Sequence, residues 1–276
     1  MTTGTLRRLL FVLPLSLITA GARASTIDGF AVLGNQSVTN TGPTTIVGNI
    51  GVSPGTSITG FGSITLTGTE DIANSPAQVA QSDALTAYNT ALGLSPTATL
   101  TGEDLGTLGP GGLAPGVYFF ASSAQLTGTL LLNAGGTDTA SWIFQIGSTL
   151  TTASGSNVEI INSGSAGSYT GNIVWQVGSS ATLGTTTNLL GDIIADASVT
   201  LNTGATIGCG GAIALGASVT LDNNTIDTGC TVAGSGSSVQ APASPIPEPG
   251  TFALLSPGLL AMVFLAFRKS RISPLI

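Results

Sequence analysis

The sequence contains no histidine, and charged side chains make up only 7% of its 276 residues. The absence of histidine removes the commonest general base and the commonest zinc ligand. All basic residues lie near the chain ends, and they are Arg7, Arg8, Arg23, Arg268, Lys269 and Arg271. A central region without cations is a poor partner for nucleic acid and lacks the usual clamp for phosphorylated substrates. We expect no metal, no cofactor and no nucleic-acid partner.

The first 24 residues have the three parts of a secretory signal peptide. A basic pair, Arg7-Arg8, precedes an apolar run at residues 9–18, and Ala22-Arg23-Ala24 forms an A-x-A cleavage site before Ser25. These features predict export, with removal of residues 1–24 from the mature protein.

The C-terminal region has a different composition. Residues 231–246 are rich in glycine, serine, alanine and proline, which is typical of a linker. Pro247-Glu248-Pro249, the apolar segment 252–267 and a basic cluster follow. Residues 247–276 therefore resemble the PEP-CTERM sorting signal of Gram-negative bacteria. The resemblance implies at least transient membrane anchoring, an exosortase-type sorting partner and a cell-surface or extracellular location. The alternative is a permanent C-terminal membrane anchor.

Residues 25–230 contain an imperfect internal repeat. The sequence Ala-Ser-Val-Thr-Leu at 197–201 returns at 217–221, and each copy is followed by a polar corner and a Thr-Ile pair. A period near 20 residues, with short β-branched runs between corners, predicts a mostly β protein built as a β-solenoid. Equivalent residues of successive coils then stack about 4.8 Å apart.

One segment interrupts the strand pattern. Ser75, Pro76 and Gln78 suit the start of a helix, with Ser75 as the N-cap, and Gly93 suits its end. Between them, apolar residues recur at helical spacing and predict one amphipathic helix at about 76–92, packed alongside the solenoid. The predicted apolar stripe consists of Val79, Ala80, Ala84, Leu85, Tyr88, Ala91 and Leu92.

The polar corners of the coils can be aligned with one another. They occupy residues 41–44, 154–157, 185–188, 203–206 and 222–225. The alignment places their first and fourth residues along one edge of the solenoid. Asp222 introduces a charge at this edge.

Six segments together resemble the bacterial and fungal ice-binding-like proteins: FAVL at 30–33, VTNTG at 38–42, GVSPG at 51–55, LAPGVY at 113–118, IFQIGS at 143–148 and VTLDNNT at 219–225. The resemblance implies a right-handed, discontinuous β-solenoid with a helix beside it. It also implies that a T-A/G-x-T/N motif contacts ice. That motif is complete at 203–206 and 41–44, and it is varied at the other corners. The implied ice-binding residues are Thr41, Thr44, Ser154, Asn157, Thr185, Asn188, Thr203, Thr206 and Thr225.

The chain has two cysteines, Cys209 and Cys230, which are 21 residues apart, or about one coil. Export favours a disulfide between them, which would staple the last coil to its neighbour. The alternative is a pair of buried thiols.

The chemistry of the corners is compatible with ice as a partner. Threonine carries a hydroxyl that can join a water lattice, a methyl group that favours ordered water, and a side chain with few rotamers. Threonine also occurs in exposed strands simply because it suits them. We expect a monomeric, exported, non-catalytic protein that adsorbs to ice. The alternative is a non-catalytic surface or matrix adhesin that binds polysaccharide.

An enzyme is the less favoured reading. Asp192 and Asp196 are the most suggestive acidic pair, but four residues of extended strand span about 13 Å, beyond the roughly 6.5–9.5 Å of an inverting glycosidase pair. Glu103 and Asp104 are expected in a solvated turn.

Overall fold

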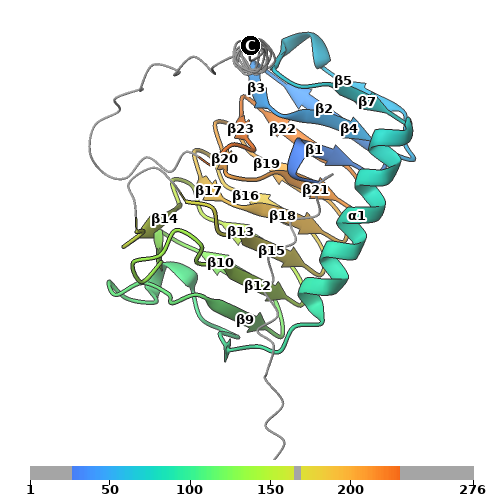
Figure 1. Cartoon of the computed structure of the whole chain (residues 1–276). Helices are drawn as coiled ribbons and strands as arrows, with labels where there is room; N and C mark the ends of the chain where they lie inside the picture. The colour runs from blue at the N-terminus through green and yellow to red at the C-terminus, as the bar shows by residue number, and fades with distance from the viewer. Residues whose placement is uncertain (1–26, 165–168, 231–276) are drawn as a thin grey trace, which may run out of the picture. The chain divides into compact units, whose positions relative to one another are not determined.

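A computed structural model describes residues 27–164 and 169–230. The predicted signal peptide, linker, apolar segment and sorting signal lie outside the described residues. Short strands wind through successive coils and form three parallel sheets (Figure 1). The predicted β-solenoid is therefore confirmed. Among the described residues, no helix has both the length and the apolarity that a membrane span requires.

Sheet A has nine strands and follows the full length of the solenoid. Their spatial order is β7 (Glu70–Ile72), β4 (Asn49–Val52), β1 (Phe30–Gly34), β21 (Ala212–Ala214), β18 (Asp192–Ala195), β15 (Ile173–Val177), β12 (Trp142–Ile146), β9 (Gly116–Phe120) and β8 (Ala98–Thr99).

Sheets B and C have seven strands each. Sheet B runs in the order β10 (Ala124–Leu126), β13 (Leu150–Thr152), β16 (Ala181–Leu183), β19 (Val199–Leu201), β22 (Val219–Asp222), β2 (Ser37–Thr41) and β5 (Ser57–Thr59). Sheet C runs in the order β11 (Thr129–Asn133), β14 (Asn157–Ile161), β17 (Asn188–Leu190), β20 (Thr206–Gly208), β23 (Thr225–Asp227), β3 (Thr44–Val47) and β6 (Ile64–Leu66). Short 3-10 helices lie at Ile27–Gly29, Phe61–Ser63 and Leu105–Thr107.

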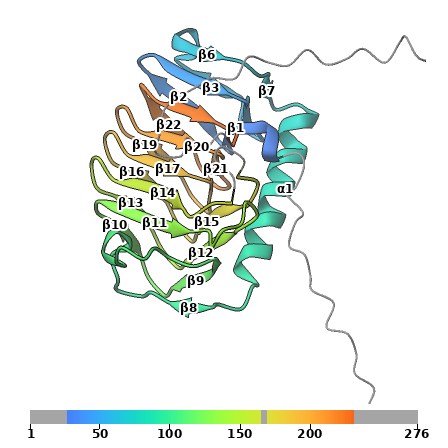
Figure 2. The ribbon, with the colours of Figure 1, turned by 60° about the vertical axis from the view of Figure 1, so that its left-hand side comes forward.

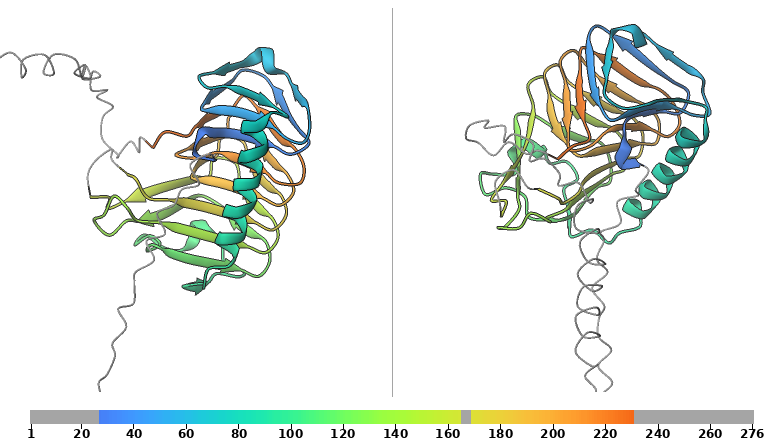
Figure 3. Two further views of the ribbon diagram at one scale, coloured as in Figure 1. Left: turned by 45° about the vertical axis from the view of Figure 1, so that its right-hand side comes forward. Right: turned by 45° about the horizontal axis from the view of Figure 1, so that its top comes forward.

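The coils do not stack in the order of the sequence. The first coil packs on the last one, because β1, β2 and β3 pair with β21, β22 and β23. Helix α1 (Ser75–Leu92) then runs beside sheet A and carries the chain to the far end of the stack, where β8 begins the remaining coils (Figures 2 and 3). The solenoid is therefore discontinuous, as the family resemblance implied.

Buried polar side chains connect the first coil of the solenoid to the last one. The Thr44 hydroxyl donates to Oδ1 of Asn40 at 2.6 Å and accepts from the backbone N–H of Asn224 at 3.1 Å. The Asn224 side chain also donates to the carbonyls of Asn202 and Ala205. These bonds satisfy groups that would be costly to bury without partners.

The helix is close to its predicted bounds, but two details of the prediction were wrong. Asn74, not Ser75, is the N-cap, and its side chain accepts from the Ala77 N–H at 3.2 Å. The buried helix positions are all alanines, at Ala77, Ala80, Ala84 and Ala91, whereas Val79, Leu85 and Leu92 are exposed. Small side chains allow the helix backbone to approach sheet A closely, while Val79, Leu85 and Leu92 lie on the outer side of the helix and Tyr88 is partly buried against the core.

Aromatic side chains fill the wide part of the core. The rings of Phe144 and Trp175 stack with centroids 4.0 Å apart, and Tyr118 stacks on Phe144 at 5.9 Å. Trp142 pairs with Ile173 and Phe144 with Trp175, so the similar strand sequences WIFQI of β12 and IVWQV of β15 lie in register on neighbouring coils. This packing holds the coils rigidly behind the surfaces of sheets B and C.

Candidate functional site

A row of threonines crosses the outer face of sheet B. On six of its seven strands the central outward residue is threonine, and the backbone register places each one opposite the next. In spatial order the row is Thr151, Thr182, Thr200, Thr220, Thr39 and Thr59, and we call it the threonine row. Gln125 occupies the same register position on β10. Neighbouring members lie about 4.8 Å apart, the spacing of paired strands.

The alternation of residue types explains this row. In β19, Val199 and Leu201 are buried on either side of Thr200, and β22 repeats the arrangement with Val219 and Leu221 around Thr220. Successive side chains of a strand point to opposite faces, so threonine is directed to solvent when its neighbours fill the core.

The hydroxyls of the threonine row make no hydrogen bond with any residue that the structure describes. A second row lies on the same face, and we call it the serine row. Each of its members comes two residues before Gln125 or a member of the threonine row. It consists of Ser123, Thr149, Ser180, Ser198, Ser218, Ser37 and Ser57. Three side-chain hydrogen bonds connect members of the serine row in pairs: Thr149 to Ser123 at 2.8 Å, Ser198 to Ser180 at 2.9 Å, and Ser37 with Ser218 at 2.8 Å. The serine row is therefore partly bonded within itself, whereas the threonine row presents its hydroxyls outward.

The two rows form an uncharged array. Along a strand, positions two apart are separated by about 6.6–6.8 Å, so the two rows define a regular two-dimensional grid. Both rows contain only hydroxyl side chains from β13 to β5, and no carboxylate or cation interrupts them there.

The corners predicted from the sequence stack as expected. Their first residues, Thr41, Ser154, Thr185 and Thr203, are exposed. Backbone bonds connect successive corners: Gly155 to Thr185 at 2.8 Å, Thr186 to Thr203 at 3.0 Å, Gly204 to Asp222 at 3.1 Å and Asn223 to Thr41 at 2.9 Å.

A left-handed backbone explains the glycine of the corner motif. The second corner position has φ between 54° and 77° in all five corners, where the residues are Gly42, Gly155, Thr186, Gly204 and Asn223. Glycine adopts this conformation without steric cost, and asparagine tolerates it. The β-branched Thr186 is the least suited of the five.

The fourth corner residues begin the strands of sheet C. Asn157, Asn188, Thr206 and Thr225 lie in register from β14 to β23. The Thr206 hydroxyl donates to Asn188 at 2.8 Å, and the Asn157 amide donates to Glu159. The outer face of sheet C thus bonds within itself and carries charge at Glu159 and Asp227.

Thr44 does not lie on this surface, contrary to the prediction. The N-terminal corner has one more residue than the others, since Thr41 pairs with Asp222 while Thr45 pairs with Thr225. Thr44 is turned inward, where it is 1% exposed, and Thr45 takes its place in the row.

Asp222 lies at the edge of the array rather than within it. It follows the threonine-row position on β22 by two residues and is in register with Thr41. Its carboxylate accepts a hydrogen bond from the Thr203 hydroxyl. The charge is therefore held at the corner, beside the uncharged rows.

The threonine row does not emerge from the alignment of the corners, because its members lie outside them. The signal was available: the repeated Val-Thr-Leu of residues 199–201 and 219–221 contains two members of the row. The other members lie in segments with weaker mutual similarity, and only the strand register identifies them.

Two of the four acidic residues raised as catalytic candidates, Asp192 and Asp104, accept hydrogen bonds from backbone groups. Oδ1 of Asp192 accepts from the Gly211 N–H at 2.9 Å. Oδ1 of Asp104 accepts from the Gly106 and Thr127 N–H groups, both at 2.9 Å. Across residues 27–164 and 169–230, no group of three or more histidine, cysteine, aspartate or glutamate side chains is placed to hold a metal ion.

A sequence model described as ice-binding-like matches residues 32–227, almost the whole described region. The chain belongs to the ice-binding-like family. It is 44% identical over 245 residues to an ice-binding protein of Nostoc sp. (strain HG1), covering 88% of this chain and 86% of the relative. An ice-binding protein of Colwellia sp is 33% identical over 214 residues, with 72% and 80% coverage.

Solved structures of family members share the fold. An ice-binding protein from an Antarctic biological consortium superimposes with a TM-score of 0.69 at 40% identity, covering 78% of this chain and 95% of its own. An ice-binding protein from the Antarctic ascomycete Antarctomyces psychrotrophicus has a TM-score of 0.68 at 36% identity, with coverage of 78% and 100%. The resemblance detected in the sequence is therefore confirmed for family and fold.

Proposed function

We propose that this member of the ice-binding-like family binds ice, and that the outer face of sheet B is its main contact surface. Its relatives carry that activity in their names. The observation that carries the proposal is the threonine row, a set of hydroxyls in register that make no hydrogen bonds with the described residues. Ice presents an array of oxygens without charge, which matches a regular, uncharged grid of hydroxyl and methyl groups.

The rigidity of the face favours adsorption. β-branched side chains have few rotamers, so little conformational entropy is lost when they meet a lattice. The aromatic core and the backbone ladders fix the relative positions of the rows. Many weak contacts on one rigid body then act together.

The corner residues border this face. We assign Thr41, Ser154, Thr185 and Thr203 to the edge between sheets B and C. Asn157, Asn188, Thr206 and Thr225 belong to the adjoining face of sheet C, where internal hydrogen bonds and nearby carboxylates make them weaker candidates for ice contact.

Export completes the proposal, because a protein that adsorbs to ice outside the cell must first leave the cytoplasm. The signal-peptide pattern of residues 1–24 and the PEP-CTERM-like residues 247–276 support delivery to the surface or the medium, with an exosortase-type enzyme as processing partner. We propose that the protein works there as a monomer and without catalysis. None of the relatives described above supports the adhesin alternative.

Thermal hysteresis and inhibition of ice recrystallisation test the proposal. The wild-type protein should show both, and Thr200→Tyr should abolish most of each because a bulky ring in the middle of the row holds the face away from a flat lattice. Thr86→Tyr, on the exposed side of α1, is the matched control and should behave as the wild type. Absence of both activities in wild-type protein at high concentration, together with binding to a polysaccharide array, would favour the adhesin.

A further inference from the structure

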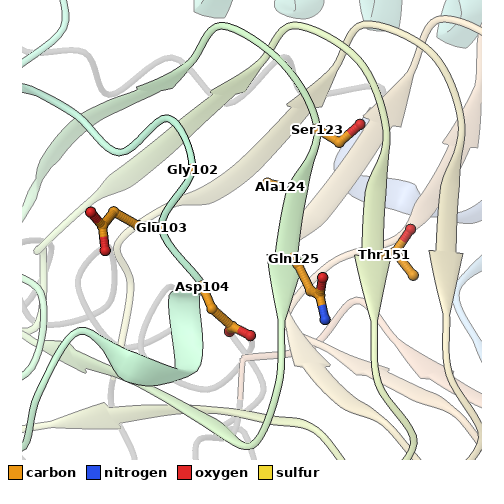
Figure 4. A pocket seen from close by; sticks show the side chains of 7 residues that line it. All are labelled: Gly102, Glu103, Asp104, Ser123, Ala124, Gln125 and Thr151. Atoms are coloured by element: carbon orange, nitrogen blue, oxygen red, sulfur yellow. The ribbon is translucent and has the colours of Figure 1, made fainter.

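The threonine row ends abruptly at one side of sheet B. Thr151 is paired with Gln125 on β10, and a parallel bridge pairs Gln125 with Asp104. The same register position is thus occupied by threonine up to β13, then by an amide, then by a carboxylate. Figure 4 shows Asp104, Gln125 and Thr151 side by side on successive segments.

The surface is hollowed at this end. A cavity of about 280 Å³ lies between the loop at residues 102–104 and strands β10 and β13, and Glu103, Asp104, Gln125 and Thr151 are among the residues that line it. Two carboxylates therefore border a depression immediately beyond the last threonine. Carboxylates hold their own oriented water, and a depression offers no flat support to a lattice.

Gln125 itself is poorly suited to continue the row. Its side chain is longer than that of threonine and has more rotamers, so immobilising it loses more conformational entropy. Its amide donates to the Thr127 hydroxyl at 3.1 Å, which directs it along its own coil. Asp104 is fixed in place by its bonds to the Gly106 and Thr127 N–H groups.

The geometry points to Gln125 and Asp104 as the boundary residues that end the ice-contacting face at Thr151. This inference rests on the proposed function and refines it, since it limits the ice contact to the six strands of sheet B that carry the threonine row. Gln125 occupies the equivalent position on the seventh strand, β10, and all three residues of β10 pair with β13. Threonine at this position would extend the row without any change of fold.

The experiment is a gain-of-function substitution, Gln125→Thr, in the full chain. Thermal hysteresis should rise by at least about 1.2-fold, the ratio of seven threonines to six, because the contacts act together. The matched control is Gln78→Thr, the same exchange at an exposed position of α1, which should leave thermal hysteresis unchanged. Circular dichroism melts verify that each variant folds.

A second variant distinguishes a boundary residue from a member of the contact surface. Gln125→Ala should retain full activity if Gln125 lies outside the contact, whereas it should lower activity if the amide itself binds ice. The inference is overturned if folded Gln125→Thr gives no increase, or if Gln125→Ala reduces thermal hysteresis. Loss of activity in Thr200→Tyr would still support ice binding in that case, whereas an inactive wild type would refute the proposed function itself.

Discussion

Thr200 and Thr220 lie directly opposite each other on β19 and β22, twenty residues apart in the sequence and one coil apart in the solenoid. Each is flanked by the same buried valine and leucine positions. This pairing is the repeating unit of the threonine row.

The double substitution Thr200→Ser and Thr220→Ser tests whether the shape of threonine matters in this unit. Serine keeps the hydroxyls but loses the methyl groups and the β-branch that restricts χ1. We expect thermal hysteresis to fall to about half or less, with the melting temperature little changed, because both side chains face solvent. Retention of full activity would mean that hydroxyl groups alone suffice. Ser82→Thr, at an exposed position of α1, is the control, and it should leave thermal hysteresis unchanged at equal protein concentration.

Thr206→Tyr distinguishes the faces of sheets B and C. Thr206 lies in the row that was predicted from the corners, and its hydroxyl already donates to Asn188. If sheet B is the main contact, this variant retains most of its thermal hysteresis, while Thr200→Tyr loses it. The reverse ranking, measured at equal protein concentration, would assign the ice contact to sheet C.

The sequence allowed the solenoid, the position of the helix and the family to be predicted, because each depends on local patterns. The repeat at 197–201 and 217–221 fixes the coil length, and Pro76 with Gly93 marks the helix ends. What could not be predicted depends on packing between distant segments. The burial of Thr44 follows from one extra residue in a corner, and the burial of the alanines of α1, rather than of its larger apolar residues, follows from the close packing of the helix on sheet A. The threonine row depends on a register that spans almost the whole domain.

Gln145 connects the helix to the solenoid, and its removal should destabilise the protein. This side chain on β12 is 3% exposed, and its Nε2 donates to the carbonyls of Ala91 and Leu94 at 2.7 and 2.8 Å. It thereby satisfies carbonyls at the C-terminal end of α1. Gln145→Ala should lower the free energy of unfolding by about 1–3 kcal/mol, because buried acceptors lose their donor. Denaturant unfolding measures the change, and Gln78→Ala on the exposed side of the helix should cost much less. Equal stability of the two variants would show that water replaces the Gln145 amide.

The cysteines are predicted to form a disulfide in the exported protein. Cys209 follows β20 and Cys230 follows β23, and these strands are neighbours through the pairing of Gly208 with Asp227. Intact mass under non-reducing conditions should be lower than that of the reduced chain by two hydrogens. Replacing both cysteines by serine should lower the free energy of unfolding by about 3 kcal/mol, as expected for a loop of this length. Quantitative alkylation of both thiols without prior reduction would contradict the pairing.

The stability of the protein should depend on pH through Asp104, which lies in the loop at the boundary of the threonine row. Partial burial alone would raise the pKa of this carboxyl, but hydrogen bonds from Gly106 and Thr127 outweigh burial and hold the pKa below its ordinary value. A lowered pKa in the folded state means that ionised Asp104 stabilises the fold fully above about pH 4, the ordinary range of aspartate. This contribution is lost as the pH falls through the folded-state pKa. Asp104→Asn keeps an oxygen acceptor and removes the charge, so the wild type should exceed it in melting temperature at pH 7, and the difference should shrink on acidification. A difference that stays constant between pH 7 and pH 2 would show that the amide hydrogen bonds do not depend on the charge of Asp104.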